Sequence, residues 1–184
     1  MLDTSQLLSG AGVELVRLAD GSTVALRPLQ PTDRAGLDAA VAGLSDRSRY
    51  LRFATAKPRL SARELDRLTD VDHRRHEALL GIDPRTHRGI AVARYVELED
   101  APGLVEVAVT VDDAWQGRGL GTLLLDRIIA RAREEGHATV RAEVLSENAR
   151  SRAMLRRAGF TVRARAGLMI EMERRLHPVA PVLR

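Results

Sequence analysis

Apolar and polar residues follow two periods along this chain, and the two periods predict an order of strands and helices. Short alternating or apolar runs predict strands at 13–18, 23–27, 77–82, 89–96, 105–111, 138–144, 161–166 and 168–174. Helical spacing and capping residues predict helices at 32–44, 61–69, 119–135 and 148–158, with a short helix or turn at 45–53. This order predicts a mostly antiparallel sheet with one parallel crossover and helices packed on it.

Local signals mark the helix boundaries. Thr32 is the predicted cap of the first helix, and Ser61 with Glu64 forms the Ser-x-x-Glu capping box of a later one. Gly136 ends the helix at 119–135. One face of that helix is apolar at every fourth residue and should pack on the sheet: Leu120, Leu124, Ile128 and Ala132. A right-handed strand–helix–strand unit makes the strands at 105–111 and 138–144 parallel.

The strand at 105–111 carries a single carboxylate in a segment that is otherwise free of charge. Side chains alternate across a strand, so the four valines share one face, and Glu106, Ala108 and Thr110 share the other. Partial burial would raise the pKa of Glu106 toward neutrality, as a general base requires. The alternative is an ion pair with one of the many arginines, because ion pairs also perturb pKa values.

A glycine-rich turn, Gln116 to Thr122, joins this strand to the long helix. Its glycines let the backbone approach a ligand closely, and the start of the helix presents free N–H groups and the positive end of its dipole. A phosphate or pyrophosphate fits such a turn. Thr122 stands where a dinucleotide fingerprint has glycine, and a P-loop needs a lysine, whereas the only lysine is Lys57. The alternative is a turn that only connects strand and helix.

Gln116-Gly117-Arg118-Gly119-Leu120-Gly121 resembles the Gln/Arg-x-x-Gly-x-Gly/Ala signature of the GCN5-related N-acetyltransferase (GNAT) family. The likeness extends from about residue 13 to residue 173. It implies the GNAT fold, an α+β fold in α/β/α layers, whose mixed, mostly antiparallel sheet has two splayed parallel central strands flanked by helices. The expected organisation is a flexible N-terminus at 1–12, a GNAT domain at 13–174 and an irregular tail at 175–184.

The resemblance also implies acetyl-CoA as the cosubstrate. In that family the turn cradles the pyrophosphate, the preceding strand bonds the thioester and pantetheine arm, and a glutamate at the position of Glu106 is often the general base. A backbone N–H near Val109 or Val111 is the candidate oxyanion contact. Asn148 and Ser151 follow the second parallel strand, although Asn148 could instead be a plain helix cap. The implied CoA-binding residues are Val109, Val111, Gln116, Gly117, Arg118, Gly119, Leu120, Gly121, Thr122, Asn148 and Ser151.

Two further features indicate which group within the family this chain resembles. Leu155 stands where many family members have a tyrosine that protonates the leaving thiolate. The bacterial Pat-type protein lysine acetyltransferases also lack that tyrosine, and the segment 44–53 looks like theirs. The resemblance places Tyr50, Arg52 and Phe53 near the acceptor side, the alternative being a packed helical hairpin with an aromatic anchor. The length indicates a catalytic domain alone.

The favoured function is acetyl-CoA-dependent N-acetylation of a primary amine. The expected acceptor is a protein lysine, with acyl-CoA synthetases among the candidate proteins. Since the chain has no cysteine, direct attack in a ternary complex, with Glu106 as the base, is the simplest route. One alternative is a small-molecule amine acetyltransferase, and another is a non-catalytic acyl-CoA-binding regulatory domain.

The length and composition of the chain exclude several other classes of function. The 184 residues fit one domain, and neither an 18-residue apolar run nor a signal-peptide layout is present, so no membrane association and a cytoplasmic location are expected. The net charge of +4 comes from evenly spread arginines with few aromatic residues, which argues against nucleic-acid binding. His73 and His76 lack a third ligand, so no metal is expected. A monomer or a homodimer fits this sequence.

Overall fold

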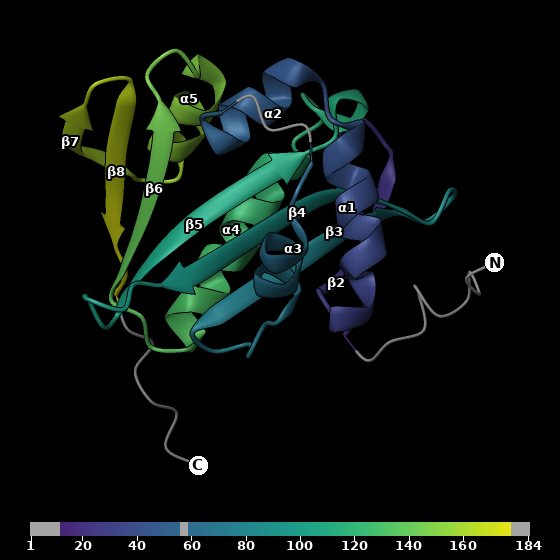
Figure 1. Cartoon of the computed structure of the whole chain (residues 1–184), viewed down its shortest axis with the longest axis horizontal. Coiled ribbons are helices and arrows are strands. Elements are labelled where there is room, and N and C mark those ends of the chain that lie inside the picture. The colour runs from purple at the N-terminus through teal and green to yellow at the C-terminus, as the bar shows by residue number, and fades with distance from the viewer. Residues whose placement is uncertain (1–11, 56–58, 178–184) are drawn as a thin grey trace.

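The computed structural model describes residues 12–55 and 59–177, which form one mixed sheet flanked by helices (Figure 1). The strands are β1 (Glu14–Arg17), β2 (Thr23–Pro28), β3 (His76–Asp83), β4 (Arg88–Glu97), β5 (Leu104–Val111), β6 (Thr139–Leu145), β7 (Thr161–Ala166) and β8 (Met169–Arg175). The helices are η1 (Pro31–Asp33), α1 (Arg34–Gly43), α2 (Asp46–Phe53), α3 (Ala62–Thr69), η2 (Asp113–Trp115), α4 (Leu120–Glu134) and α5 (Ala149–Arg157). The predicted α+β class is confirmed.

The sheet has the strand order β1-β2-β3-β4-β5-β6-β8-β7, and β5 with β6 is its parallel pair. α4 packs on one face through the apolar positions predicted from the sequence, and Leu124 and Ile128 are fully buried there. On the other face, Val92 of β4 packs against a cluster of buried residues from α1 and α3. Each fully buried aliphatic side chain stabilises this layering by about 1.5–3 kcal/mol.

The two parallel strands separate soon after they meet. Only three residue pairs join them, and the last of these pairs Glu106 with Arg141. β5 continues to Val111 and β6 to Leu145, so both strands run on beyond their last contact. The expected splay of the central parallel strands is therefore confirmed, and it opens the sheet at the carboxyl ends of these strands.

Most local predictions hold, but Thr32 does not cap α1. The capping box of Ser61 and Glu64 forms as predicted. Ahead of α1, however, the chain makes the short helix η1, in which the backbone N–H of Gln30 donates to Asp33 at 2.8 Å. Asp33 also pairs with the buried Arg27 at 2.6 Å. The cap prediction was wrong because the ion pair between Asp33 and Arg27 of β2, which a helix-capping pattern does not show, makes Asp33 the residue that organises this turn.

The first strand of the sheet begins at Glu14 and the last ends at Arg175. β8 ends at Arg175, one residue beyond the expected boundary. Residues 1–11 and 178–184, which make up most of the expected flexible N-terminus and tail, lie outside the described residues. Within the part of the chain that is described, no helix is long and apolar enough to cross a membrane.

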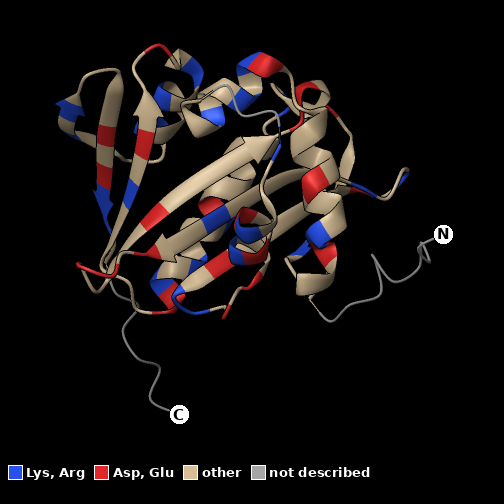
Figure 2. Cartoon of the chain, viewed as in Figure 1, with Lys and Arg blue, Asp and Glu red and all other residues tan. Residues whose placement is uncertain are grey.

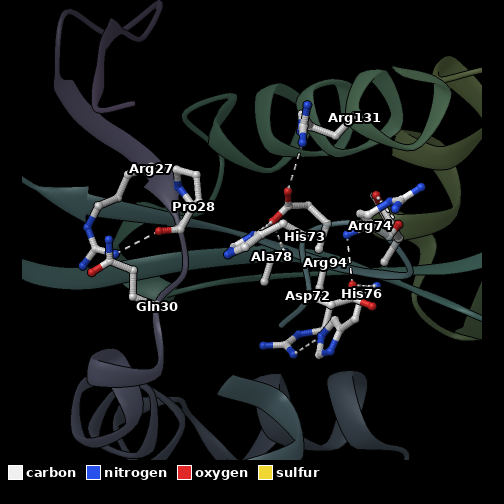
Figure 3. A network of polar contacts seen from close by, with 12 residues as sticks. Arg27, Pro28, Gln30, Asp72, His73, Arg74, His76, Ala78, Arg94 and Arg131 are labelled. Carbon is white, nitrogen blue, oxygen red and sulfur yellow. Dashed lines mark hydrogen bonds and ion pairs between the residues drawn. The ribbon is translucent and has the colours of Figure 1, made fainter. Parts of the chain in front are cut away.

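A buried carboxylate joins β3 to α4 on the face away from α1 and α3. Glu77 accepts hydrogen bonds from the backbone N–H of Ala78 and the ring of His73, both at 2.8 Å, and Arg131 of α4 lies 3.5 Å away. Figure 3 shows His73 and Arg131 converging from opposite sides. Burial of a charge requires such partners, so this cluster fixes α4 against the sheet.

Candidate active site

Glu106 lies half-buried on the face of β5 opposite α4. Its cross-strand partner on β4 is Val96, and Thr110 on the same face lies opposite Val92, which packs under α1 and α3. Among the described residues, no ion pair holds Glu106. Burial raises the pKa of Glu106 above its ordinary value, and the nearby Glu143 raises it further, whereas Arg52 and Arg141 act to lower it. These observations favour the general-base interpretation over the ion-pair alternative.

A cavity of about 820 Å³ occupies the gap between the splayed strands. Its walls come from β5, β6, the turn before α4 with the start of that helix, and helices α5 and α2. The cavity brings together most of the residues predicted from the sequence: Glu106, Val109, Val111, Gln116, Gly117, Gly119, Gly121, Thr122, Asn148, Ser151, Arg52 and Phe53.

Three predicted site residues are not among the residues that line this cavity. Arg118 lies over the ring of Trp115, 4.8 Å from its centroid, and 3.5 Å from Asp20. Leu120 is buried in the main core, so only its backbone faces the turn. Tyr50 of α2 is half-buried away from the cavity wall. The side chains of these residues therefore contribute nothing to the cavity surface.

The exposed edge of β5 carries backbone groups into the gap. At the two ends of the β4–β5 ladder, Leu98 donates to Leu104 at 2.9 Å and Asp112 donates to Ile90 at 2.8 Å. Hydrogen-bonded residues alternate in an antiparallel ladder, so the even-numbered residues of β5 bond to β4. The N–H and C=O groups of Val109 and Val111 consequently point toward the gap. Such an edge can hold an extended amide-bearing chain.

The turn before α4 is shaped for an anion. Gly117 has φ +82° and Gly119 has φ +90°, both in the left-handed region that favours glycine. Helix α4 begins at Leu120, so its first free N–H groups lie at this turn. Together with the helix dipole, these groups can bind phosphate or pyrophosphate.

Helix α2 forms the other wall of the cavity, opposite the base. The Nε atom of Arg52 donates to the hydroxyl of Thr110 at 3.1 Å, and its guanidinium lies 5.0 Å from the ring centroid of Phe53. Burial lowers the pKa of Arg52, while the charge of Glu106 acts to raise it. Arg52 thus brings a cation to the strand that carries the base.

Asn148 is a helix cap, which was the alternative to a direct contact with CoA. Its side-chain oxygen accepts the backbone N–H of Ser151 at 3.1 Å, which makes it the cap of α5. Both residues still border the cavity. Leu155 is buried and also borders the cavity, so an apolar side chain occupies the place of the family's tyrosine.

The sequence reasoning missed several polar residues of the cavity wall. Ser48, Asp113, Glu143 and Arg150 all line it. The position of Asp113 three residues before the start of the glycine-rich turn was a usable signal, as was that of Arg150 two residues after Asn148. Ser48 and Glu143 carried no such signal, because only the packing of α2 and the pairing of β6 place them here.

The positions of His73 and His76 do not create a metal site. His73 bonds to Glu77, and the ring of His76 lies 3.2 Å from the guanidinium of Arg94. Burial lowers the pKa of His76, and the charge of Arg94 adds to this effect. Among the described residues, no group of three or more histidine, aspartate or glutamate side chains is placed to hold a metal ion.

Comparison with known proteins agrees with this geometry. The family model for the acetyltransferase (GNAT) domain matches residues 23–161. The chain is 32% identical to Acetyltransferase PA5475 of Pseudomonas aeruginosa over 65% of this chain and 64% of that protein. It is 31% identical to Acetyltransferase Pat of Mycolicibacterium smegmatis over 78% of this chain and 43% of that protein. The chain thus spans less than two thirds of the length of either relative.

A solved structure has a similar fold over most of this chain. The crystal structure of the GNAT domain of S. lividans PAT superposes with a TM-score of 0.82 and is 33% identical, covering 89% of this chain and 97% of that one.

Proposed function

This chain belongs to the GNAT acetyltransferase family, and we propose that it transfers an acetyl group from acetyl-CoA to a primary amine, with a protein lysine as the acceptor. The observation that carries this proposal is the position of Glu106. It is a half-buried carboxylate without an ion pair among the described residues, at the point where β5 and β6 separate. The resemblance of the segment 44–53 to the Pat-type protein lysine acetyltransferases supports a protein acceptor, and two relatives of this chain carry the name Pat.

The surroundings of the base also favour a large acceptor. Helices α1 and α3 lie over the N-terminal half of the sheet and α2 lies beside the end of β5, whereas β7, at the other edge, is exposed at every residue (Figure 1). Acidic residues occur on the neighbouring strands β5, β6 and β8 (Figure 2). Glu143 of β6 is exposed and pairs in register with Glu171 of β8. On this face Arg141 pairs with Glu171 and Glu173. A lysine on a protein surface can reach a base that borders such an open face.

The cavity fits acetyl-CoA by the chemistry of its walls. The β5 edge at Val109 and Val111 would hold the pantetheine arm, and the N–H groups from Gly117 to Gly121 would hold the pyrophosphate. Arg150 adds a positive charge beside this turn. A methyl group added at Gly117 would lie 3.5 Å from the Nη2 atom of Arg150. When bound, acetyl-CoA supplies an acyl group activated as a thioester.

The chain's own residues would perform the proton transfer. A lysine ammonium has a pKa of about 10.4, so a base is needed to generate the free amine at neutral pH. Glu106 accepts that proton, directly or through water, and its raised pKa suits this task. The amine nitrogen then attacks the thioester carbon, the C–S bond breaks and CoA leaves as a thiolate. The second proton lost by the attacking nitrogen passes to this thiolate or to water, which leaves a neutral amide. We expect the backbone N–H of Val109 or Val111 to stabilise the oxyanion.

The leaving group does not require a tyrosine. A thiol has a pKa of about 8.5, so a thiolate is a tolerable leaving group near neutral pH. Leu155, which stands in the position of the family's tyrosine, has no proton to donate. With no cysteine in the chain, direct transfer in a ternary complex is the simplest route.

The release of free thiol from acetyl-CoA tests this proposal. The acceptors would be a panel of small amines and a panel of lysine-bearing proteins that includes acyl-CoA synthetases. Turnover with proteins alone supports lysine acetylation. Turnover with a small amine moves the function to the modification of metabolites or drugs. Binding of CoA without turnover on any acceptor would favour the non-catalytic acyl-CoA-binding alternative.

A further inference from the structure

Helix α2, which forms the acceptor-side wall, is attached mainly by polar contacts. None of its residues is fully buried, although Phe53 packs partly against the cluster under α1 and α3. At its N-terminal end, the carboxylate of Asp113 accepts the backbone N–H of Ser45 at 2.9 Å and the hydroxyl of Ser48 at 2.5 Å. Arg49 also donates to the carbonyl of Ala42 at 3.1 Å. The position of α2 therefore depends on a few hydrogen bonds.

The same carboxylate is connected to the glycine-rich turn. The side-chain amide nitrogen of Gln116, the first residue of that turn, lies 3.2 Å from Asp113 Oδ1, from the hydroxyl of Ser48 and from the carbonyl of Val111. The amide oxygen of Gln116 accepts a hydrogen bond from Arg150 of α5 at 2.9 Å. A continuous set of polar contacts thus runs from α5 through the turn to α2.

Helix α2 carries this connection on to the base. Ser48 and Arg52 are four residues apart, so they lie on the same face of the helix. Ser48 contacts Asp113, while Arg52 contacts Thr110, which shares the β5 face of Glu106. A shift of α2 would therefore move the Arg52 guanidinium relative to the base and to the acceptor.

We infer that Asp113 is a positioning residue that couples binding of the CoA pyrophosphate at the Gln116–Gly121 turn to the placement of α2 on the acceptor side. An anion bound at the turn contacts the backbone next to Gln116 and so favours one arrangement of Gln116, Asp113 and Ser48. Coupling of this kind is reciprocal, so acetyl-CoA and the amine acceptor each increase the affinity for the other. The inference rests on the proposed function for the identity of the two ligands.

Hydrogen exchange over α2 tests the coupling with CoA alone as the probe. In the wild type, we expect saturating CoA to slow amide exchange in residues 46–53 by about fivefold or more. Asp113→Asn should abolish most of this protection while changing the Kd for CoA, measured by calorimetry, by less than about threefold. Direct contact between CoA and α2 would instead leave the protection in place in this variant and would overturn the inference.

Asp112→Asn is the matched control, because Asp112 is the neighbour of Asp113 in the segment before the glycine-rich turn, and its hydrogen bond stays within that segment. Its side chain accepts the N–H of Ala114 at 2.9 Å and caps η2. This control should retain the CoA-dependent protection, and an equal loss in both variants would contradict a specific role for Asp113. Ser48→Ala provides a second variant if Asp113→Asn does not fold, and it too should lose the protection.

Steady-state kinetics separate positioning from chemistry. At saturating acetyl-CoA, Asp113→Asn should raise the KM for the acceptor by about fivefold or more with kcat changed by less than about twofold. A lower kcat with an unchanged KM would overturn the inference. If no amine is a substrate, the proposed function fails, but the exchange experiment can still be interpreted because it requires only CoA.

Discussion

Glu106 lies opposite Arg141 in the register between β5 and β6, and these two residues are the last pair before the strands separate. The guanidinium of Arg141 is nevertheless engaged by other carboxylates. Glu173 lies 2.8 Å from it and Glu171 lies 3.5 Å from it. The carboxylate of Glu106 therefore stands at the apex of the gap without an ion pair among the described residues, where a reacting amine can meet it.

Removing the base should reduce turnover without loss of cosubstrate binding. Glu106→Gln keeps the size and shape of the side chain but cannot accept the proton, so we expect kcat to fall by at least about tenfold at neutral pH. The Kd for acetyl-CoA should remain nearly unchanged in calorimetry. Asp126→Asn, an exposed acid on α4, is the control and should behave as the wild type. Unchanged turnover in Glu106→Gln would remove this residue from the mechanism.

The pH dependence of kcat/KM should reflect the charges around Glu106. The base works only when ionised, and its pKa is raised by burial and by Glu143, so activity should fall as the pH drops through this raised pKa. Glu143→Gln removes a like charge and should move the acid limb to lower pH. Arg52→Gln removes an opposite charge and should move it to higher pH. Movement of the acid limb in the same direction in both variants would contradict the assignment of that limb to Glu106.

Two glycines of the turn should differ in their tolerance of a methyl group. Gly119 has φ +90°, and no atom lies within 4 Å of a Cβ built there, so Gly119→Ala is strained by its backbone alone. We expect a cost of about 1–3 kcal/mol in the free energy of unfolding, together with weaker CoA binding. Gly121 lacks a positive φ, and its Cβ would meet Met154 at an ordinary 3.5 Å, so Gly121→Ala should be tolerated. Urea unfolding and calorimetry would measure both effects, and equal behaviour of the two variants would contradict this explanation.

The packing of α4 should dominate the stability of the domain. Leu124 is 0% exposed in the main core, so Leu124→Ala should lower the free energy of unfolding by about 2–5 kcal/mol. Leu168 is 66% exposed in the turn between β7 and β8, so Leu168→Ala should change this free energy by less than about 0.5 kcal/mol. Denaturant titration of both variants provides the test. A small effect of Leu124→Ala would contradict the expected importance of α4 packing, because it would mean that the core closes the space left by the leucine.

Local patterns predicted most of the elements because they depend on residues close together in the chain. The four-residue spacing of Leu120, Leu124 and Ile128 predicted a helix that packs on the sheet, and all three residues are buried. The capping box at Ser61 formed for the same local reason. Thr32 failed as a cap because Asp33 pairs with Arg27, and that pair exists only once β2 and η1 have packed together.

The sequence by itself determined the strand with its single carboxylate, the glycine-rich turn and the helix that follows, since alternation, positive φ and capping act over a few residues. Only the tertiary structure decided how far β5 and β6 run together, and therefore where the cavity opens. It also decided that Arg141 turns to Glu173 and not to Glu106, and that Ser48 meets Asp113 across 65 residues of chain. Such contacts depend on sheet register and helix packing, which bring distant residues together only when the whole domain has folded.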